Sequence, residues 1–103
     1  MRILTKRTVN TYAKRFPKAK RALIDWFRLA EEASWPTPNA VKATLGTSSI
    51  ITAERVVFNI HGNDFRLIVA IDYARQWLFV LWFGTHADYD DINAATVTFE
   101  EPS

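Results

Sequence analysis

The sequence predicts an α+β fold in which an N-terminal strand and two helices pack on an antiparallel sheet of three to four strands, followed by a short C-terminal helix. Two patterns support this prediction. Apolar residues recur at helical spacing in the first third of the chain, and they alternate in the manner of strands after Arg55. With 103 residues, the chain is expected to form a single domain over residues 1–103 that can bury a core.

The first third of the chain is predicted to hold a short strand, within Met1 to Thr5, and two helices. Apolar residues at helical spacing define the first helix, namely Val9, Tyr12, Ala13 and Phe16. Pro17 should end that helix and open the next, because proline lacks a backbone N–H and suits a first helical turn. One apolar stripe then predicts a helix to about Ser34. Its members are Ala19, Leu23, Trp26, Ala30 and Ala33.

The next segment is predicted to be a linker, a short helix and a loop. Trp35 to Pro38 contains two prolines and reads as a rigid linker. Asn39 can cap a short helix that runs to about Thr44, because its side chain can accept a bond from an N-terminal helical N–H. Gly46 to Thr52 is expected to be a loop.

Three antiparallel strands joined by tight turns should follow as a meander. Arg55 to Ile60 and Phe65 to Tyr73 alternate apolar and polar residues, with His61 to Asp64 as the turn between them. After a second turn at Ala74 to Gln76, Trp77 to Phe83 is nearly continuous in apolar residues, as a central strand would be. Such a meander brings the first turn and the exit of the third strand to the same end of the sheet.

Polar residues with chemical capability should therefore gather at that end. They are His61, Asn63, Arg66, Thr85, His86, Tyr89 and Asp90. Thr85 can cap a C-terminal helix from about His86 to Ala94, with acids in its first turns where the helix dipole favours them. Hairpin counting places Arg66 opposite Gly84, where the absence of a side chain suggests a concavity.

Arg66, His86 and Tyr89 form the candidate catalytic set. Arginine can bind a phosphate through two N–H groups, histidine can transfer a proton near neutral pH, and tyrosine can hydrogen-bond or stack a base. Together they suffice for metal-free RNA cleavage, in which a ribose 2'-hydroxyl attacks the adjacent phosphate.

Structural roles for the same side chains are the alternative interpretation. Arg66 can have no role beyond an ion pair with Asp64 or Asp88, His86 can serve in a helix cap, and Tyr89 can cover the sheet. Asn63 is of a type common in turns, and Lys42 is a surface lysine on this interpretation. Three tryptophans on apolar faces are expected in the core rather than as platforms for bases. These are Trp26, Trp77 and Trp82.

Charge is distributed unevenly along the chain. Residues 1–30 contain nine Lys and Arg and a single acid, Asp25, whereas only acids follow His86. Five basic residues near the junction of the two predicted helices lie mostly off the apolar stripes, namely Lys14, Arg15, Lys18, Lys20 and Arg21. Such a surface is typical of a polyanion-binding protein, although a solvated helix face gives the same pattern.

Several functional classes are disfavoured by composition. The chain contains no cysteine, which excludes disulfides and thiolate chemistry and fits a reducing cytoplasm. The two histidines lie 25 residues apart without ligand spacing, so no metal site and no cofactor is expected. No apolar run reaches the roughly 18 residues that a membrane span needs, and no signal peptide is recognisable.

Two ordered segments resemble a known family, the HigB-type toxins of the RelE/ParE toxin superfamily. The segments are Arg55 to Ile68 (RVVFNIHGNDFRLI) and Phe83 to Ile92 (FGTHADYDDI). The segment Pro38 to Ala43 and the basic N-terminal helices are also similar to the family pattern. The resemblance implies a RelE-like fold and a ribosome-dependent mRNA endonuclease that inhibits translation. It also implies neutralisation by a helix-turn-helix antitoxin of the HigA type.

Carried over by position, the resemblance assigns Asn63 and Arg66 to the first motif. It assigns four residues to the second, namely Thr85, His86, Tyr89 and Asp90. RNA contacts are expected from Asn63, His61, Lys42 and the five basic helix residues. The chain departs from the pattern at His61, Asp64 and Asp91, where basic residues are common, and fewer positive charges predict weaker phosphate binding. A non-catalytic toxin of the same fold, acting on another target such as gyrase, is the alternative.

Overall fold

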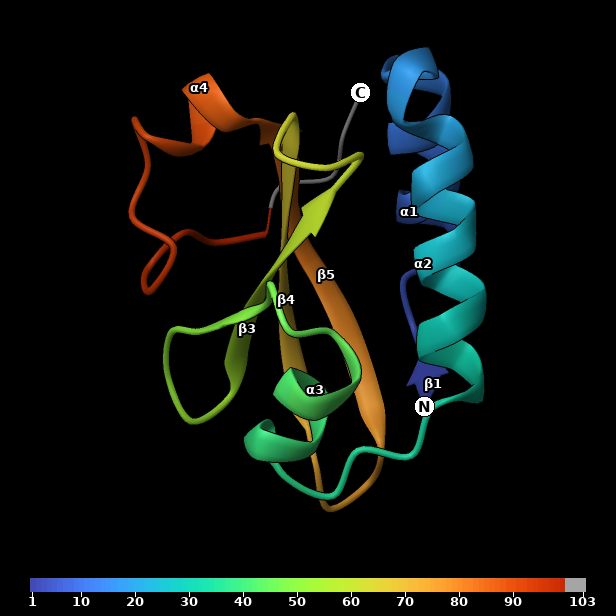
Figure 1. Cartoon of the computed structure of the whole chain (residues 1–103), viewed down its shortest axis with the longest axis vertical. Coiled ribbons are helices and arrows are strands. Elements are labelled where there is room, and N and C mark those ends of the chain that lie inside the picture. The colour runs from blue at the N-terminus through green and yellow to red at the C-terminus, as the bar shows by residue number, and fades with distance from the viewer. Residues whose placement is uncertain (100–103) are drawn as a thin grey trace.

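A computed structural model describes residues 1–99 and confirms the α+β class (Figure 1). The elements in chain order are β1 (Arg2–Ile3), α1 (Lys6–Arg15), the 3₁₀ helix η1 (Pro17–Ala19), α2 (Lys20–Glu32), α3 (Pro38–Thr44), β2 (Ser49–Ile50), β3 (Arg55–Ile60), β4 (Phe65–Asp72), β5 (Trp77–Thr85) and α4 (His86–Tyr89). Within this part of the chain, no helix is long and apolar enough to cross a membrane.

Over residues 1–99 the sheet has five strands in the order β1-β5-β4-β3-β2, where three to four were expected. The meander of β3, β4 and β5 is antiparallel as predicted, but β1 runs parallel to β5. The additional strand β2 lies inside the segment that was predicted to be a loop, and it pairs with Val56 and Val57 of β3. A segment of two residues is too short to show the alternation of apolar and polar residues that predicts a strand. Only its pairing with β3 therefore identifies β2.

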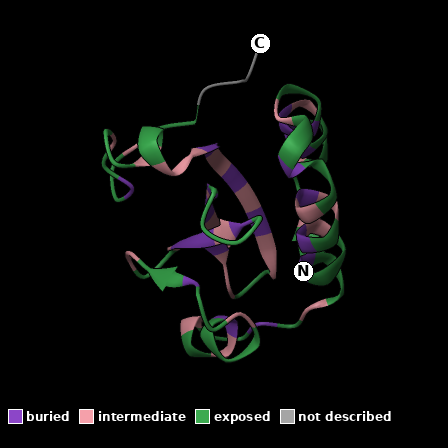
Figure 2. Ribbon diagram, turned by 45° about the horizontal axis from the view of Figure 1, so that its top comes forward, coloured by how far each residue is buried: buried purple, intermediate pink, exposed green. Residues whose placement is uncertain are grey.

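The main core lies between the sheet and the helices α1 and α2, which cover one of its faces (Figures 1 and 2). The predicted stripe is confirmed, because Leu23 and Ala30 are fully buried and Trp26 is 6% exposed. Basic residues occupy the opposite, exposed side of these helices. Trp35 was expected in a linker but is only 2% exposed. Its ring stacks on Phe58 with centroids 6.2 Å apart, so this linker is part of the core.

Helix α3 begins earlier than the sequence suggested. Thr37, not Asn39, is the N-cap, and its hydroxyl accepts the backbone N–H of Ala40 at 3.2 Å. Pro38 then occupies the first helical position, where its missing N–H costs nothing.

Helix α4 is much shorter than predicted and ends at Tyr89 rather than near Ala94. The chain turns back instead, and Ala94 packs against Val57 and Ile68 on the face of the sheet that α1 and α2 leave open. The Arg55 guanidinium fixes this path by donating to the carbonyls of Ala94 and Val97 at 2.9 and 2.7 Å. Burial of the tail therefore outweighs continuation of the helix.

The pairing of β4 with β5 confirms that Arg66 lies opposite Gly84. The register is not constant along these strands, because it shifts between Ile68 and Val69. Ile68 pairs with Trp82 and Val69 pairs with Val80, so Leu81 is an extra residue in β5. This bulge sets which β5 side chains share a face with Arg66.

Candidate active site

Two chain segments meet at the upper end of the sheet in Figure 1, as the meander predicted. Phe65 at the start of β4 pairs with Thr85 at the end of β5. The backbone N–H of His86 donates to the carbonyl of Asp64 at 2.9 Å, which joins α4 to the β3–β4 turn. Thr85 caps α4 by accepting the N–H of Asp88 at 3.1 Å, so the predicted cap is confirmed.

Arg66 lies half-buried on the sheet face opposite the helices, and the β3–β4 turn holds its guanidinium. It donates to Asn63 three residues earlier, at 2.5 Å to the side-chain oxygen and 3.1 Å to the carbonyl, and to the Phe65 carbonyl at 3.1 Å. Within residues 1–99 its partners include neither Asp64 nor Asp88. Asn63 is thus both a turn residue and a support for Arg66.

Tyr89 of α4 is in contact with Arg66. The Arg66 Cζ atom lies 6.0 Å from the centre of the Tyr89 ring, in cation–π contact. Tyr89 also packs against Trp82, with ring centroids 6.2 Å apart and planes at 52°. The three side chains form one continuous cluster, which we call the Arg66 cluster: Arg66, Tyr89 and Trp82.

Trp82 was expected in the core and is instead half-buried on the face of the sheet away from the helices. Its indole fills the space above Gly84, where a Cβ atom would lie 2.7 Å from Trp82 Cη2. The concavity predicted over Gly84 is therefore occupied. Sequence parity could have found this, because Trp82 and Gly84 are two residues apart on one strand. Asn59 is a further residue beside the site that was not predicted. It pairs with Arg66 across the sheet, so strand pairing could have identified it.

His86 begins α4 and is half-buried. Its Nε2 atom lies 3.6 Å from Asp90 Oδ1, and a spacing of three residues puts His86 and Tyr89 on the same side of the helix. The short helix therefore carries a group that can transfer a proton and the ring that contacts Arg66. Trp77, also expected in the core, is half-buried at the other end of β5, 5.2 Å from the Arg75 guanidinium.

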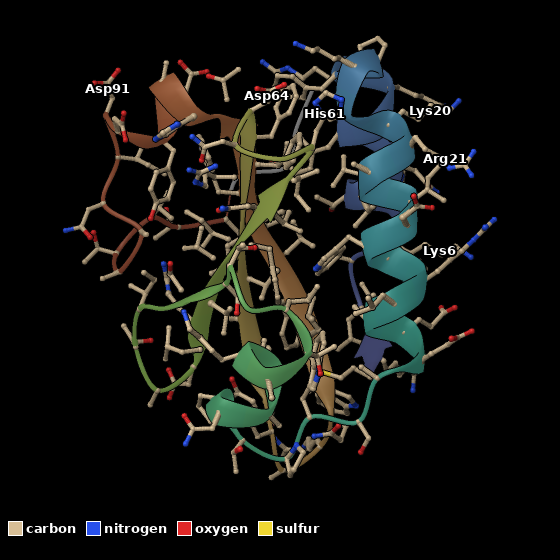
Figure 3. All side chains as sticks on the ribbon, in the orientation of Figure 1. Lys6, Lys20, Arg21, His61, Asp64 and Asp91 are labelled. Carbon is tan, nitrogen blue, oxygen red and sulfur yellow. The ribbon has the colours of Figure 1, made fainter. Side chains whose placement is uncertain are left out.

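His61 belongs to a different set of contacts. Its Nδ1 atom lies 2.8 Å from Asp64 Oδ2, and Lys18 of η1 approaches the same carboxylate at 3.4 Å. The His61 hydrogen bond, and after it Lys18, lower the pKa of Asp64 below its ordinary value of 3.8. Figure 3 shows His61 and Asp64 on the side of the turn that faces the helices. The structure thus separates His61 from the Arg66 cluster.

The basic residues gather where α1 passes into α2, at the same end of the molecule as the turn (Figures 1 and 3). We call this surface the basic junction: Lys14, Arg15, Lys18, Lys20 and Arg21, all exposed. Lys42 lies elsewhere, on α3 toward the opposite end of the sheet (Figure 1). Its ammonium donates to the Ser48 carbonyl at 2.6 Å, so it joins neither group.

Carboxylates also surround this end of the molecule. Asp88, Asp90 and Asp91 are exposed on or just after α4. In the part of the chain that is described, no three His or acidic side chains are close enough to one another to hold a metal ion. The groups available for chemistry are therefore a guanidinium, an imidazole, a phenol and scattered carboxylates.

Comparison with known proteins agrees with this architecture. The pattern of the family described as HigB toxin, RelE-like toxic component of a toxin-antitoxin system, matches residues 19–92. The chain is also 24% identical over 94 residues to the mRNA interferase HigB of Escherichia coli O6:H1 (strain CFT073), which covers 89% of this chain and 91% of that protein. The matched residues include the Arg66 cluster and His86, and the chain belongs to the HigB family of RelE-like toxins, with an antitoxin as its counterpart.

Proposed function

We propose that this toxin is an mRNA endonuclease that inhibits translation by cleaving message on the ribosome in the cytoplasm. The observation that carries the proposal is the contact of the Arg66 guanidinium with Tyr89, with His86 on the same short helix. Similarity to a protein named mRNA interferase supports the reaction class.

Arg66 is suited to bind the scissile phosphate. Its hydrogen bonds to the turn use three of the five N–H donors of a guanidinium, which leaves donors for phosphate oxygens. The turn and the Tyr89 ring hold the group in place, so little reorganisation is needed when charge develops on the phosphate. Tyr89 can stack on a base or orient it through its hydroxyl.

The proposed reaction requires two proton transfers. The ribose 2'-oxygen attacks phosphorus as its proton leaves to a general base, the bond from phosphorus to the 5'-oxygen breaks, and that oxygen receives a proton from a general acid. The products are a 2',3'-cyclic phosphate and a 5'-hydroxyl. His86 is assigned to one of these transfers, and either role is worth typically 10² to 10⁴-fold in rate.

The basic junction and Asn63 are assigned to binding rather than to chemistry. The basic junction is an exposed cationic surface at the same end of the molecule as the Arg66 cluster, and such surfaces bind phosphates through release of counterions. Ribosomal RNA is the polyanion proposed for it. His61 and Lys42 were also predicted RNA contacts, but their bonds to Asp64 and Ser48 favour a structural role.

The chemical proposal is tested by mapping RNA ends after incubation of the purified toxin with translating ribosomes. The wild type should leave 2',3'-cyclic phosphate or 3'-phosphate ends, and Arg66→Ala should lower cleavage by about 10²-fold or more. Tyr89→Phe separates the hydroxyl from the ring, because stacking is retained. Cleavage should survive a chelator if the magnesium that keeps ribosomes assembled is retained. Ends with a 3'-hydroxyl would show a different mechanism, and growth arrest without cleavage would favour a non-catalytic toxin.

The partner proposed for the toxin is a helix-turn-helix antitoxin of the HigA type, encoded next to it. Co-expression with the neighbouring helix-turn-helix gene should give a stable complex and restore growth. Failure of both would exclude that protein as the antitoxin, without affecting the assignment of the chemistry.

A further inference from the structure

A groove of about 340 Å³ lies between α2 and β3, on the side of the β3–β4 turn away from the Arg66 cluster. Its walls are mainly apolar, and they include Trp26 and Leu29 from α2, Leu45 after α3, and Phe58 and Ile60 from β3. Leu29 is 37% exposed and adds an accessible apolar side chain to the wall of the groove. The mechanism proposed above makes no use of this groove.

One wall of the groove is a strand edge without a neighbour. β2 pairs with β3 only at Val56 and Val57, whereas β3 continues to Ile60. Among residues 1–99 no strand pairs with this side of Phe58, Asn59 and Ile60. An open edge of this kind offers backbone N–H and C=O groups to an extended peptide.

The charges around the groove favour an acidic ligand. Its upper end, at His61 and Gly62, adjoins Lys18, and the first turn of α2 adds Lys20 and Arg21. Among the described residues, Asp25 is the only acid that lines the groove, and Arg21 approaches it at 3.5 Å. Lys18 is bridged to Asp64 and Arg21 to Asp25, so the excess of positive charge around the groove comes from Lys20.

We infer that the groove binds an extended, acidic segment of the antitoxin, which adds a strand to β3 at Phe58–Ile60. This inference rests on the proposed toxin–antitoxin pairing and not on the chemistry of cleavage. Backbone pairing supplies affinity, apolar side chains of the segment fill the space beside Leu29 and Leu45, and its acids face the basic junction. Binding here would cover the cationic surface while leaving the Arg66 cluster on the opposite face uncovered.

The test is the affinity of groove variants for the protein encoded by the neighbouring helix-turn-helix gene. Leu29→Glu places an acid beside the segment and should weaken binding by about tenfold or more, because like charges in an interface are strongly unfavourable. Leu29→Lys should weaken it less. Leu4→Glu is the matched control, since Leu4 is 39% exposed and does not line the groove.

Hydrogen exchange provides an independent readout of strand addition. Among residues 58–60, the amides that point away from β4 should gain protection on complex formation. RNA cleavage by free Leu29→Glu toxin should equal that of the wild type. Equal affinities of wild type and Leu29→Glu without new protection would overturn the inference while leaving the pairing intact. If the wild type fails to bind, the pairing and the inference both fail, whereas the cleavage assay still reports on the chemistry.

Discussion

The two histidines lie at the same end of the sheet but in contrasting surroundings. His61 faces the helices, where its ring is fixed by a 2.8 Å bond to Asp64 and lies 6.4 Å from the Phe65 ring. His86 is on α4, beside the Arg66 cluster, and its nearest acid, Asp90, is 3.6 Å away. A hydrogen bond of ordinary length holds the first imidazole, whereas the second lies just beyond that length from its acid.

This difference separates two functions that the sequence had grouped together. His61, Asp64 and Lys18 connect the β3–β4 turn to η1, and so stabilise the end of the molecule that carries the basic junction. His86 shares its helix with Tyr89, which contacts Arg66. The side of the β3–β4 turn that carries His61 is thus suited to binding, and the side that carries His86 is suited to chemistry.

The contrast between the two histidines is tested most directly by replacing each of them with alanine. His86→Ala should lower the rate of RNA cleavage by about 10²-fold or more, because a proton-transfer group is removed. His61→Ala should leave the rate within a few-fold of the wild type and mainly lower the melting temperature. Single-turnover cleavage of ribosome-bound message and circular dichroism provide the measurements. Full activity in His86→Ala would remove the assignment.

Gly84→Ala tests whether the Trp82 indole holds Tyr89 in place. The new methyl group would lie 2.7 Å from Trp82 Cη2, so the ring must move. Overpacking of this kind costs about 1–3 kcal/mol in the free energy of unfolding, and a shift of Tyr89 should also reduce cleavage. Gly46→Ala is the control, since no heavy atom of the described residues lies within 4 Å of its added Cβ. Equal stability and activity of the two variants would show that the Trp82 indole can move without a cost in stability or activity.

The other side of the turn can be tested through salt dependence. Replacement of Lys14, Arg15 and Lys20 by Ala should weaken ribosome binding, because fewer phosphates are neutralised. The slope of log affinity against log salt should fall by roughly 0.7 to 0.9 for each phosphate that the variant no longer neutralises. The rate of cleavage once bound should change little. An unchanged slope would mean that the basic junction is only a solvated helix face.

The smallest expected effect concerns Asp64, whose pKa is lowered by the His61 hydrogen bond and by Lys18. A carboxylate with a lowered pKa in the folded state adds stability at pH values above its ordinary pKa and loses that contribution as the pH falls through the folded value. Asp64→Asn should therefore lower the melting temperature at pH 7, and the difference from wild type should shrink as the pH falls below the ordinary pKa of 3.8. Asp91→Asn, which removes a carboxylate at the exposed end beyond α4, is the matched control variant (Figure 3).

The position of Arg66 opposite Gly84 was predicted correctly, although the length of the turn between β4 and β5 was not. A three-residue turn at Ala74 to Gln76 would pair Tyr73 with Trp77, whereas Asp72 pairs with Trp77 in the sheet. The bulge at Leu81 compensates by one residue, which restores the Arg66 to Gly84 pair. Hairpin counting succeeded because two single-residue shifts cancel, and strand periodicity carries no information on either.

Local patterns in the sequence determined the helices α1 and α2, the three-stranded meander and the shared end at which Arg66 and His86 lie. These features follow from apolar periodicity and turn residues, which act over a few positions of the chain. Tertiary structure alone decided the pairing of β1 and β2, the early end of α4 and the indole over Gly84. Each of these depends on packing between segments of the chain, such as the bond from Arg55 to the carbonyl of Ala94. Burial gained through this packing outweighs local preference, and it is this packing that separates His61 from His86.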